Sequence, residues 1–418
     1  MPDKRRKGPS LQGKSGKKLI QILDAFINAL SRLIKNHWFH IHSFRNTDKF
    51  AMISQNTLKK FFYRIILGVN ILFALALILS YLSVHINPDT IALPALFGLA
   101  YPYLLLVNLI FAIIWAIALK WEALISVVVI AAGFTHFSNY LKIQKPSGDK
   151  TGTFQVESYN VRLFNYFENR KSSISEKMIL ELLRNGKADI ICLQEVYIMG
   201  DPEQKEQEIK SALGGKYYSH FKVIGTGNNR YYGIATLSKF PMIDRGDIVH
   251  EKSSSLSIYT DILAGKDTIR VFNNHLQSFR LHRMERTFLN EIVETSDDKE
   301  TLNEIVNISS SLRKGFVKRA AQAETVKARI DKSPYPVIVA GDFNDTPVSY
   351  SYRKIRKGLN DAFVSSGYGA GFTYRGNYPP NRIDYILYDN AIECRQFDIL
   401  KVKYSDHYPI IAYFRKKN

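Results

Sequence analysis

VIVAGDFNDTP, residues 337–347, is the stretch of sequence that decides the fold. Its first four residues are small or β-branched apolar residues bracketed by Pro336 and Gly341, a pattern that predicts a short strand buried on both faces. Asp342 and Asn344 follow two residues apart, on the same side of an extended chain. At the mouth of a buried strand they can orient a water, a metal ion or a phosphate oxygen. The alternative is a turn in which both side chains bond the local backbone.

Length and charge divide the chain into regions. At 418 residues it exceeds what one hydrophobic core supports. Residues 1–60 carry 13 Lys and Arg against 3 Asp and Glu, whereas residues 142–418 carry 42 against 33. The basic arm therefore supplies about half of the net charge of +19. Two cysteines, Cys192 and Cys394, are too few for a disulfide framework, and Cys192 lies in an apolar run that predicts a buried thiol.

The basic arm, residues 1–60, has two parts. Residues 1–18 are polar and rich in Gly and Ser, which predicts disorder, and they lack the layout of a signal peptide. Residues 19–39 repeat apolar side chains at helical spacing beside lysines and arginines. This pattern predicts a helix that lies on an anionic membrane surface or packs on another part of the protein.

Residues 61–141 form an apolar region with almost no charge. About 20 apolar residues suffice to cross a bilayer, so residues 61–86 and 91–119 are each long enough, and residues 123–140 offer a third, weaker crossing. We expect three transmembrane helices. The alternative is a set of buried helices in a soluble protein.

The excess of Lys and Arg before residue 61 predicts the orientation, because positive loops stay in the cytoplasm. Three crossings then place residues 142–418 on the outer side of the inner or plasma membrane, in the periplasm or outside the cell. Lys142, Lys145 and Lys150 oppose this orientation. With only two crossings the C-terminal region would be cytoplasmic.

After a linker at residues 142–152, strand patterns alternate with helical ones through residues 153–418. This order predicts a single α/β layered domain. The predicted helices cover residues 174–185 and the long, charged segment 282–331, where the helical pattern is clearest at residues 314–329. The predicted strands cover residues 153–159, 189–193, 231–237, 268–274, 337–340, 382–387 and 409–413.

Several apolar runs of this domain carry, at their end or beside them, a polar residue that can bind a metal or phosphate. Alone, such a residue is an ordinary solvated carboxylate or a structural histidine. Ligands of layered α/β folds gather at one rim of the strands, so together these residues are expected to share a pocket. They are Asn160, Glu195, His275, Asp342, Asn344, Asp384, Asp406 and His407.

These residues lie in six of seven motifs that occur in the order of a known family. The chain closely resembles the endonuclease/exonuclease/phosphatase family, metal-dependent phosphodiesterases that include pancreatic deoxyribonuclease and neutral sphingomyelinases. The resemblance covers nearly all of residues 150–418. The motifs are YN at 159–160, LQEV at 193–196, GIATLSKFP at 233–241, NNHLQS at 273–278, GDFN at 341–344, RIDYI at 382–386 and SDH at 405–407.

The resemblance implies a four-layered α/β sandwich, two packed mixed β-sheets flanked by helices, and says nothing about residues 1–141. The predicted fold is therefore this sandwich preceded by the N-terminal transmembrane region inferred from its apolar residues. The resemblance also implies a metal site, with Glu195 as the principal ligand and Asn160 and Asp406 holding or orienting the ion. An oxygen-rich site of this kind suits Mg²⁺ or Mn²⁺ better than zinc.

The remaining residues take catalytic roles by the same resemblance. Asp342 positions and deprotonates the attacking water, while Asn344 and His275 contact phosphoryl oxygens. His407 is the partner of the scissile phosphate, and Asp384 orients His407. Physical chemistry agrees, because a metal and fixed donors stabilise the charge that develops on a phosphate attacked by water.

The predicted function is a membrane-anchored, divalent-metal-dependent hydrolase of phosphate esters. Its substrate stays open between nucleic acid and a lipid headgroup or other small phosphodiester, since Lys and Arg attract either polyanion. In the loop NNRYY, residues 228–232, Arg230 and the two tyrosines either contact substrate or are neutral surface residues. The alternative function is a non-catalytic, membrane-tethered binding module, but every motif residue that chemistry requires is present.

Overall fold

The computed structural model describes residues 49–146, 148–167, 172–251, 253, 255–279, 298–376 and 380–417. The predictions for residues 1–18 and 19–39 therefore lie outside the described residues. The chain forms two compact units, residues 1–67 and residues 68–418. Most of the apolar region thus belongs to the same unit as the α/β domain.

Five helices cover the apolar region. They are α2 (Lys49–Leu82), α3 (Leu93–Leu99), α4 (Tyr101–Ile117), α5 (Ala123–Ala132) and α6 (Phe134–Phe137). Among the described residues only Thr57–Leu82, within α2, is a single helix long and apolar enough to cross a membrane. The pair α3 and α4 meets the same test together but is bent by 70°. The third predicted crossing is divided at Gly133, and its longer part, α5, has 10 residues and a length of about 15 Å.

A buried polar network joins α2, α4 and α5. Asn70 donates to the Ser126 hydroxyl (2.7 Å) and accepts from the Trp115 indole N–H (3.0 Å), and Ser126 donates to Asn108 (3.3 Å). The outward side chains are apolar instead, with Leu72 and other large residues more than half exposed. Polar groups inside and apolar groups outside are typical of helices that associate in lipid.

The α/β domain contains two mixed six-stranded sheets. The Asp342 sheet has the strand order β10-β12-β9-β8-β7-β6, and the Glu195 sheet has the order β13-β14-β2-β3-β5-β4. A two-stranded sheet pairs β1 (Leu141–Lys142) with β11 (Gly369–Ala370). The strands of the Asp342 sheet are β6 (Met242–Ile248), β7 (Leu256–Ala264), β8 (Asp267–His275), β9 (Val337–Asp342), β10 (Asn360–Asp361) and β12 (Asp384–Tyr388). Those of the Glu195 sheet are β2 (Phe154–Asn160), β3 (Ile190–Met199), β4 (Tyr218–Gly227), β5 (Arg230–Ser238), β13 (Ile392–Ile399) and β14 (Ile410–Lys416).

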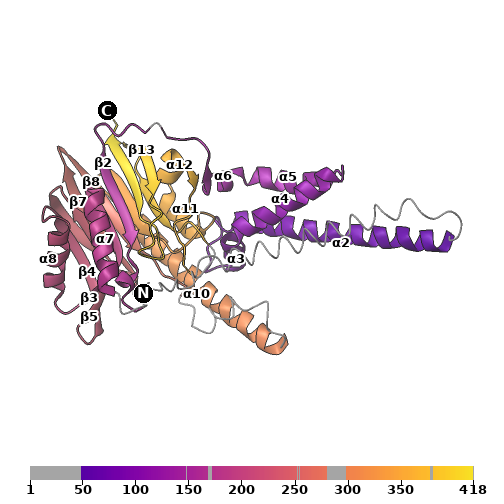
Figure 1. Cartoon of the computed structure of the whole chain (residues 1–418), viewed down its shortest axis with the longest axis horizontal. Helices are drawn as coiled ribbons and strands as arrows, with labels where there is room; N and C mark the ends of the chain where they lie inside the picture. The colour runs from indigo at the N-terminus through magenta and orange to yellow at the C-terminus, as the bar shows by residue number, and fades with distance from the viewer. Residues whose placement is uncertain are drawn as a thin grey trace, which may run out of the picture. The chain divides into compact units, whose positions relative to one another are not determined.

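Helices cover the outer face of each sheet, as Figure 1 shows. The helices α7 (Ser172–Gly186) and α8 (Pro202–Ala212) pack on the Glu195 sheet through residues such as Leu183 and Ile209. The helices α10 (Asp298–Ile330) and α11 (Tyr350–Arg356) pack on the Asp342 sheet through residues such as Val326 and Ile355. The short helices η1 (Arg162–Asn165) and α12 (Ala362–Ser366) complete the domain. The predicted four-layered sandwich is confirmed.

Strand β9 shows why the sequence gives two packed sheets. Side chains alternate along a strand, so Val337 and Val339 enter the core under α10, while Ile338 and Ala340 enter the core between the sheets. Both cores are apolar, which is why this strand reads as a continuous apolar run. Cys192 is buried between the sheets, as predicted.

Glu157 on β2 is a carboxylate buried in this frame without a partner. Its side chain is 1% exposed, and neither oxygen has a hydrogen-bond partner among the residues described. One oxygen lies under the C-terminal residue of α7, Gly186. Burial raises the pKa of Glu157 from 4.5 to about 8.

Replacing Glu157 therefore tests the packing under α7. The folded chain holds this proton more tightly than the unfolded chain, so its stability falls as the pH rises from about 4.5 through about 8. We predict that Glu157→Gln raises the stability by about 3 kcal/mol at pH 8 and by much less at pH 5. Thermal melting of the full-length chain in detergent at both pH values measures the difference. The exposed Glu251→Gln is the control, and an equal gain at both pH values would contradict the burial of Glu157 as described.

Candidate functional site

Three candidate residues form a row across the Asp342 sheet. Asp342 ends β9, and its partners in the strand register are His275, at the end of the parallel strand β8, and Asp384, the first residue of the antiparallel strand β12. Neighbouring strands lie about 4.8 Å apart, so the three side chains stand next to one another on one face. Distant parts of the sequence meet here because parallel pairing aligns the ends of β8 and β9.

The Glu195 sheet contributes the facing residues. Asn160 ends β2 and pairs with Gln194 of β3. The predicted strand at residues 189–193 is too short, because β3 continues to Met199 and Glu195 lies within it. The register with β5 shifts between Leu193 and Val196, and Glu195 has a φ of 53°. A bulge of this kind re-aims a side chain, here toward the rim where the two sheets meet.

Asn160 joins the two sheets at this rim. Its amide nitrogen donates to Asp342 (2.9 Å) and lies 3.2 Å from a Glu195 oxygen. Its amide oxygen accepts from the backbone N–H of Arg162 (2.9 Å), so this residue holds the two carboxylates and turns its oxygen away from them. The carboxylates of Glu195 and Asp342 thus share one donor.

His275 faces the same two carboxylates. Its Nε2 lies 3.2 Å from a Glu195 oxygen and 3.9 Å from an Asp342 oxygen. The angles do not satisfy a hydrogen bond, so among the described residues this buried nitrogen has no hydrogen-bond partner. It is a polar atom directed into the site that can serve a ligand.

His407 is held by Asp384. Its Nδ1 lies 2.9 and 3.0 Å from the two Asp384 oxygens, and its Nε2 lies 3.7 Å from an Asp342 oxygen and 3.9 Å from an Asp406 oxygen. The Tyr374 ring packs edge-on against the imidazole. Both ring nitrogens face carboxylates, an arrangement that suits the doubly protonated imidazolium.

Carboxylates and imidazoles alternate in this cluster, and burial together with these neighbours determines the pKa of each group. Burial raises the pKa of Asp342 to about 6, against the opposing effect of His407. Burial also disfavours charge on Glu195 and on both histidines, but here the partners prevail. His275 lowers the pKa of Glu195 to about 2, and Glu195 in turn raises the pKa of His275. Asp384 and Asp342 hold the pKa of His407 well above its ordinary value.

The last two candidate residues have partners of their own. Asp406 lies 3.1 Å from the Arg162 guanidinium, and burial raises its pKa. The Asn344 side chain donates to the Leu276 carbonyl (3.0 Å) and to Asp342 (3.2 Å) instead of pointing into open space. All eight predicted residues therefore lie at one rim, and Asn344 supports Asp342 there.

Sequence reasoning missed several residues that build the rim. Gln194 donates to Asn273 (2.7 Å), and Asn273 donates to the Ala235 carbonyl (2.8 Å). These fully buried amides therefore link the Glu195 sheet to the Asp342 sheet beneath the site. Arg382 makes a two-pronged ion pair with Asp361, both buried. Gln194, Asn273 and Arg382 lie inside the motifs LQEV, NNHLQS and RIDYI, so their place in these motifs was the sequence signal that could have identified them.

The NNRYY stretch forms the turn of the β4–β5 hairpin and the first residues of β5. Asn228 and Asn229 form its turn with positive φ, the usual role of Asn in a tight hairpin. Arg230 lies opposite Met199, the last residue of β3. Contact of this hairpin with substrate stays a prediction.

A metal ion has two possible places at the rim. Asp342, Asp384 and His407 offer ligand atoms within 4.8 Å of one another, but both ring nitrogens of His407 already face carboxylates, and an imidazolium has no lone pair for a metal. Glu195 and Asp406 are the more accessible carboxylates, with side chains 27% and 16% exposed. Their hard oxygens fit Mg²⁺ or Mn²⁺.

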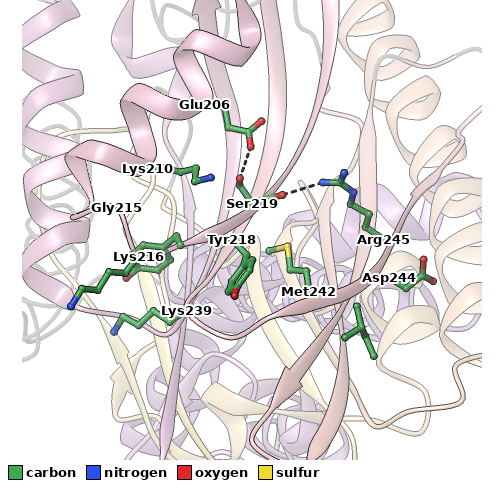
Figure 2. Close-up of a pocket in the computed structure, with 12 residues that line it drawn as sticks. Glu206, Lys210, Gly215, Lys216, Tyr218, Ser219, Lys239, Met242, Asp244 and Arg245 are labelled. Atoms are coloured by element: carbon green, nitrogen blue, oxygen red, sulfur yellow. Dashed lines mark hydrogen bonds between the residues drawn. The ribbon is translucent and has the colours of Figure 1, made fainter.

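A groove lies elsewhere on the α/β domain. It has a volume of about 960 Å³ and is lined by Lys216, Lys239, Arg245 and neighbouring residues (Figure 2). Lys239 follows the β5 residue that pairs with Ile190, the first residue of β3, whereas Glu195 lies at the bulge in the middle of that strand. The groove contains no histidine among its lining residues and is separate from the candidate site.

The fold is a four-layered α/β sandwich with an acid and histidine cluster at one rim. Residues 158–407 match the family model described as the endonuclease/exonuclease/phosphatase family. The chain therefore belongs to the endonuclease/exonuclease/phosphatase family, whose members are typically metal-dependent hydrolases of phosphate esters. Residues 63–140 match a second model, described as a domain of unknown function. A comparison with curated proteins finds no match.

Solved structures of the same kind resemble the chain. The human Nocturnin catalytic domain with bound sulfate is 19% identical with a TM-score of 0.46, over 68% of this chain and 99% of that one. A family protein from Leptotrichia buccalis is 16% identical with a TM-score of 0.44, over 63% and 100%. One from Bacteroides vulgatus is 15% identical with a TM-score of 0.45, over 63% and 99%.

The clustered carboxylates predict that a divalent ion stabilises the folded chain. An ion that binds only the folded state adds about 2.7 kcal/mol at a concentration a hundred times its dissociation constant. We therefore expect Mg²⁺ to raise the melting temperature of the full-length chain by several degrees, and Glu195→Gln to remove most of that rise. Glu251→Gln, on the surface, should retain it. An unchanged Mg²⁺ effect in Glu195→Gln would exclude Glu195 as a ligand.

Proposed function

We propose that the protein is a membrane-anchored, divalent-metal-dependent phosphodiesterase. The observation that carries the proposal is the position of Asp342, a buried carboxylate that accepts from Asn160 and lies between His275 and His407. A base flanked by two cationic imidazoles suits a water molecule attacking an anionic phosphoryl group.

The chemistry assigned to each residue follows from its partners. Asp342, with a pKa of about 6, takes a proton from water as the water oxygen forms a bond to phosphorus and the ester bond breaks. His407, kept cationic by Asp384, stabilises negative charge on the phosphoryl oxygens, and His275 assists it. A divalent ion held by Glu195 and Asp406 would neutralise further charge on these oxygens. Asn160 and Asn344 keep Asp342 in place.

The same cluster argues against the alternative binding module. Binding alone does not require a buried base beside a histidine that is oriented by a second carboxylate. Asp342, Asp384 and His407 are all present and mutually bonded or adjacent.

Two substitutions test this site. We predict that Asp342→Asn and His407→Ala each reduce hydrolysis of bis(4-nitrophenyl) phosphate by at least about a thousandfold, since each removes a group that acts in the transition state. Circular dichroism should show an unchanged fold. Asp244→Asn, more than half exposed on β6, is the matched control. Near-normal turnover in either site variant would show that the chemistry takes place elsewhere.

The substrate class stays open between nucleic acid and a lipid or other small phosphodiester. A panel of plasmid DNA, RNA, sphingomyelin and phosphatidylinositol phosphates, each with Mg²⁺ and with chelator, separates the classes. The full-length chain is the proper enzyme, because a fragment starting at residue 150 would remove Asn139, whose carbonyl accepts from the buried Arg382 (2.9 Å).

We further propose that α2 crosses the bilayer and that α4 and α5 form a hairpin within it. The chain leaves this hairpin on the side of the membrane where α2 ends, because hydrogen bonds among Asn70, Asn108 and Ser126 hold α2, α4 and α5 against one another. The α/β domain is then on the opposite side from the basic arm, whether the hairpin crosses fully or not. With positive residues inside, that side is the outer one.

Cysteine labelling tests this topology. Both native cysteines are buried, so added ones report alone. We expect a membrane-impermeant maleimide to label Lys403→Cys in intact cells and Lys59→Cys only after permeabilisation. Labelling of both residues from the same side would contradict the proposed topology.

A further inference from the structure

The apolar helices pack directly on the loop that follows Asp342. Residues 343–349 form this loop, and within it Thr346 and Val348 are fully buried. The Ser83 hydroxyl, just beyond α2, lies 2.7 Å from the Val348 carbonyl, and the Thr346 hydroxyl lies 3.4 Å from the carbonyl of Gly98 in α3. These contacts join parts of the chain about 250 residues apart.

Gly98 permits this close approach. A Cβ atom at position 98 would lie 2.3 Å from the Val348 carbonyl oxygen and 2.4 Å from the Ser83 oxygen, far inside contact distance. Only glycine lets α3 lie against the loop in this way. The Ser83 hydroxyl is also 2.6 Å from the Ser80 carbonyl, so it shares its single proton between its own helix and the loop.

The loop connects this contact with Asp342 over a short length of chain. Thr346 is four residues beyond Asp342, at most about 14 Å of extended chain. Between them, the backbone N–H of Asn344 donates to the Asp342 carboxylate (2.7 Å). On the other side, Arg319 donates to the Asp345 carboxylate (3.1 Å), and Tyr385 donates to the Asp345 carbonyl (2.8 Å). The loop is thus held between the α/β domain and the apolar helices.

A second attachment reaches the neighbouring carboxylate. The carbonyl of Asn139, after α6, accepts from Arg382, two residues before Asp384. Strand β1 follows and pairs with β11. Both Asp342 and Asp384 are therefore linked to the apolar helices through segments of two to six residues.

We propose that Ser83 and Gly98 are positioning residues for hydrolysis, which act through residues 343–349 to hold Asp342 in line with its water. The apolar region is then part of the catalytic unit and more than a tether. This inference rests on the proposed function, because it assigns Asp342 the role of the base.

The test measures kcat, KM and the Mg²⁺ concentration for half-maximal rate with the full-length chain in detergent and bis(4-nitrophenyl) phosphate as substrate. Gly98→Ala inserts an atom into the contact, and Ser83→Ala removes the donor. Two matched controls lie in the same region. Gly68→Ala adds a methyl group where no described atom outside its own stretch of helix lies within 4 Å. Ser80→Ala removes a hydroxyl that, among the described residues, donates to the Leu77 carbonyl of its own helix.

We expect kcat to fall about a hundredfold in Gly98→Ala, the cost of misplacing a reacting group by about 1 Å, and about fivefold in Ser83→Ala, the effect of one lost hydrogen bond. KM and the Mg²⁺ requirement should stay within twofold of wild type, and both controls should keep wild-type kcat. If a variant lost activity only because less of it was folded, its melting temperature would fall and the loss of activity would match the loss of active enzyme.

The inference is overturned if Ser83→Ala and Gly98→Ala turn over as fast as their controls. If Gly98→Ala does not fold, Ser83→Ala against Ser80→Ala decides alone. A wild-type chain without turnover on this substrate contradicts the proposed function itself, and this inference with it.

Discussion

The hydrogen bond from the Asn160 amide to Asp342 is the interaction on which the site depends. It links the ends of two strands in different sheets, and the same nitrogen faces Glu195. Two carboxylates brought together in a buried rim repel each other unless donors separate them. Asn160, His275 and His407 supply those donors and cations, so the negative charge of the two carboxylates is tolerated inside the fold.

Much of this arrangement follows from the sequence because it is built from strand ends. VIVAGDFN encodes its strand, its two buried faces and the exit of Asp342 within a few residues, and the order of the seven motifs predicts the family. Parallel pairing then brings the site residues together, since it places Asn160, the end of β2, beside Gln194 of β3 and aligns the ends of β8 and β9 at His275 and Asp342.

What the sequence did not reveal depends on long-range geometry. A bulge at Glu195 depends on the register with β5, which no local pattern encodes. The amide chain through Gln194 and Asn273 needs both sheets in place, and the contact of Gly98 with Val348 joins an apolar helix to a loop far along the chain. In the same way, residues 123–140 are apolar enough for a helix, yet the helix is interrupted at Gly133.

Isotope transfer from solvent water tests the central claim most directly. The account predicts that the full-length chain, with Mg²⁺ and bis(4-nitrophenyl) phosphate in ¹⁸O-labelled water, places one ¹⁸O atom in the phosphate monoester and none in nitrophenol, because water activated at Asp342 attacks phosphorus. Label in the nitrophenol, or no Mg²⁺-dependent product at all, would contradict it.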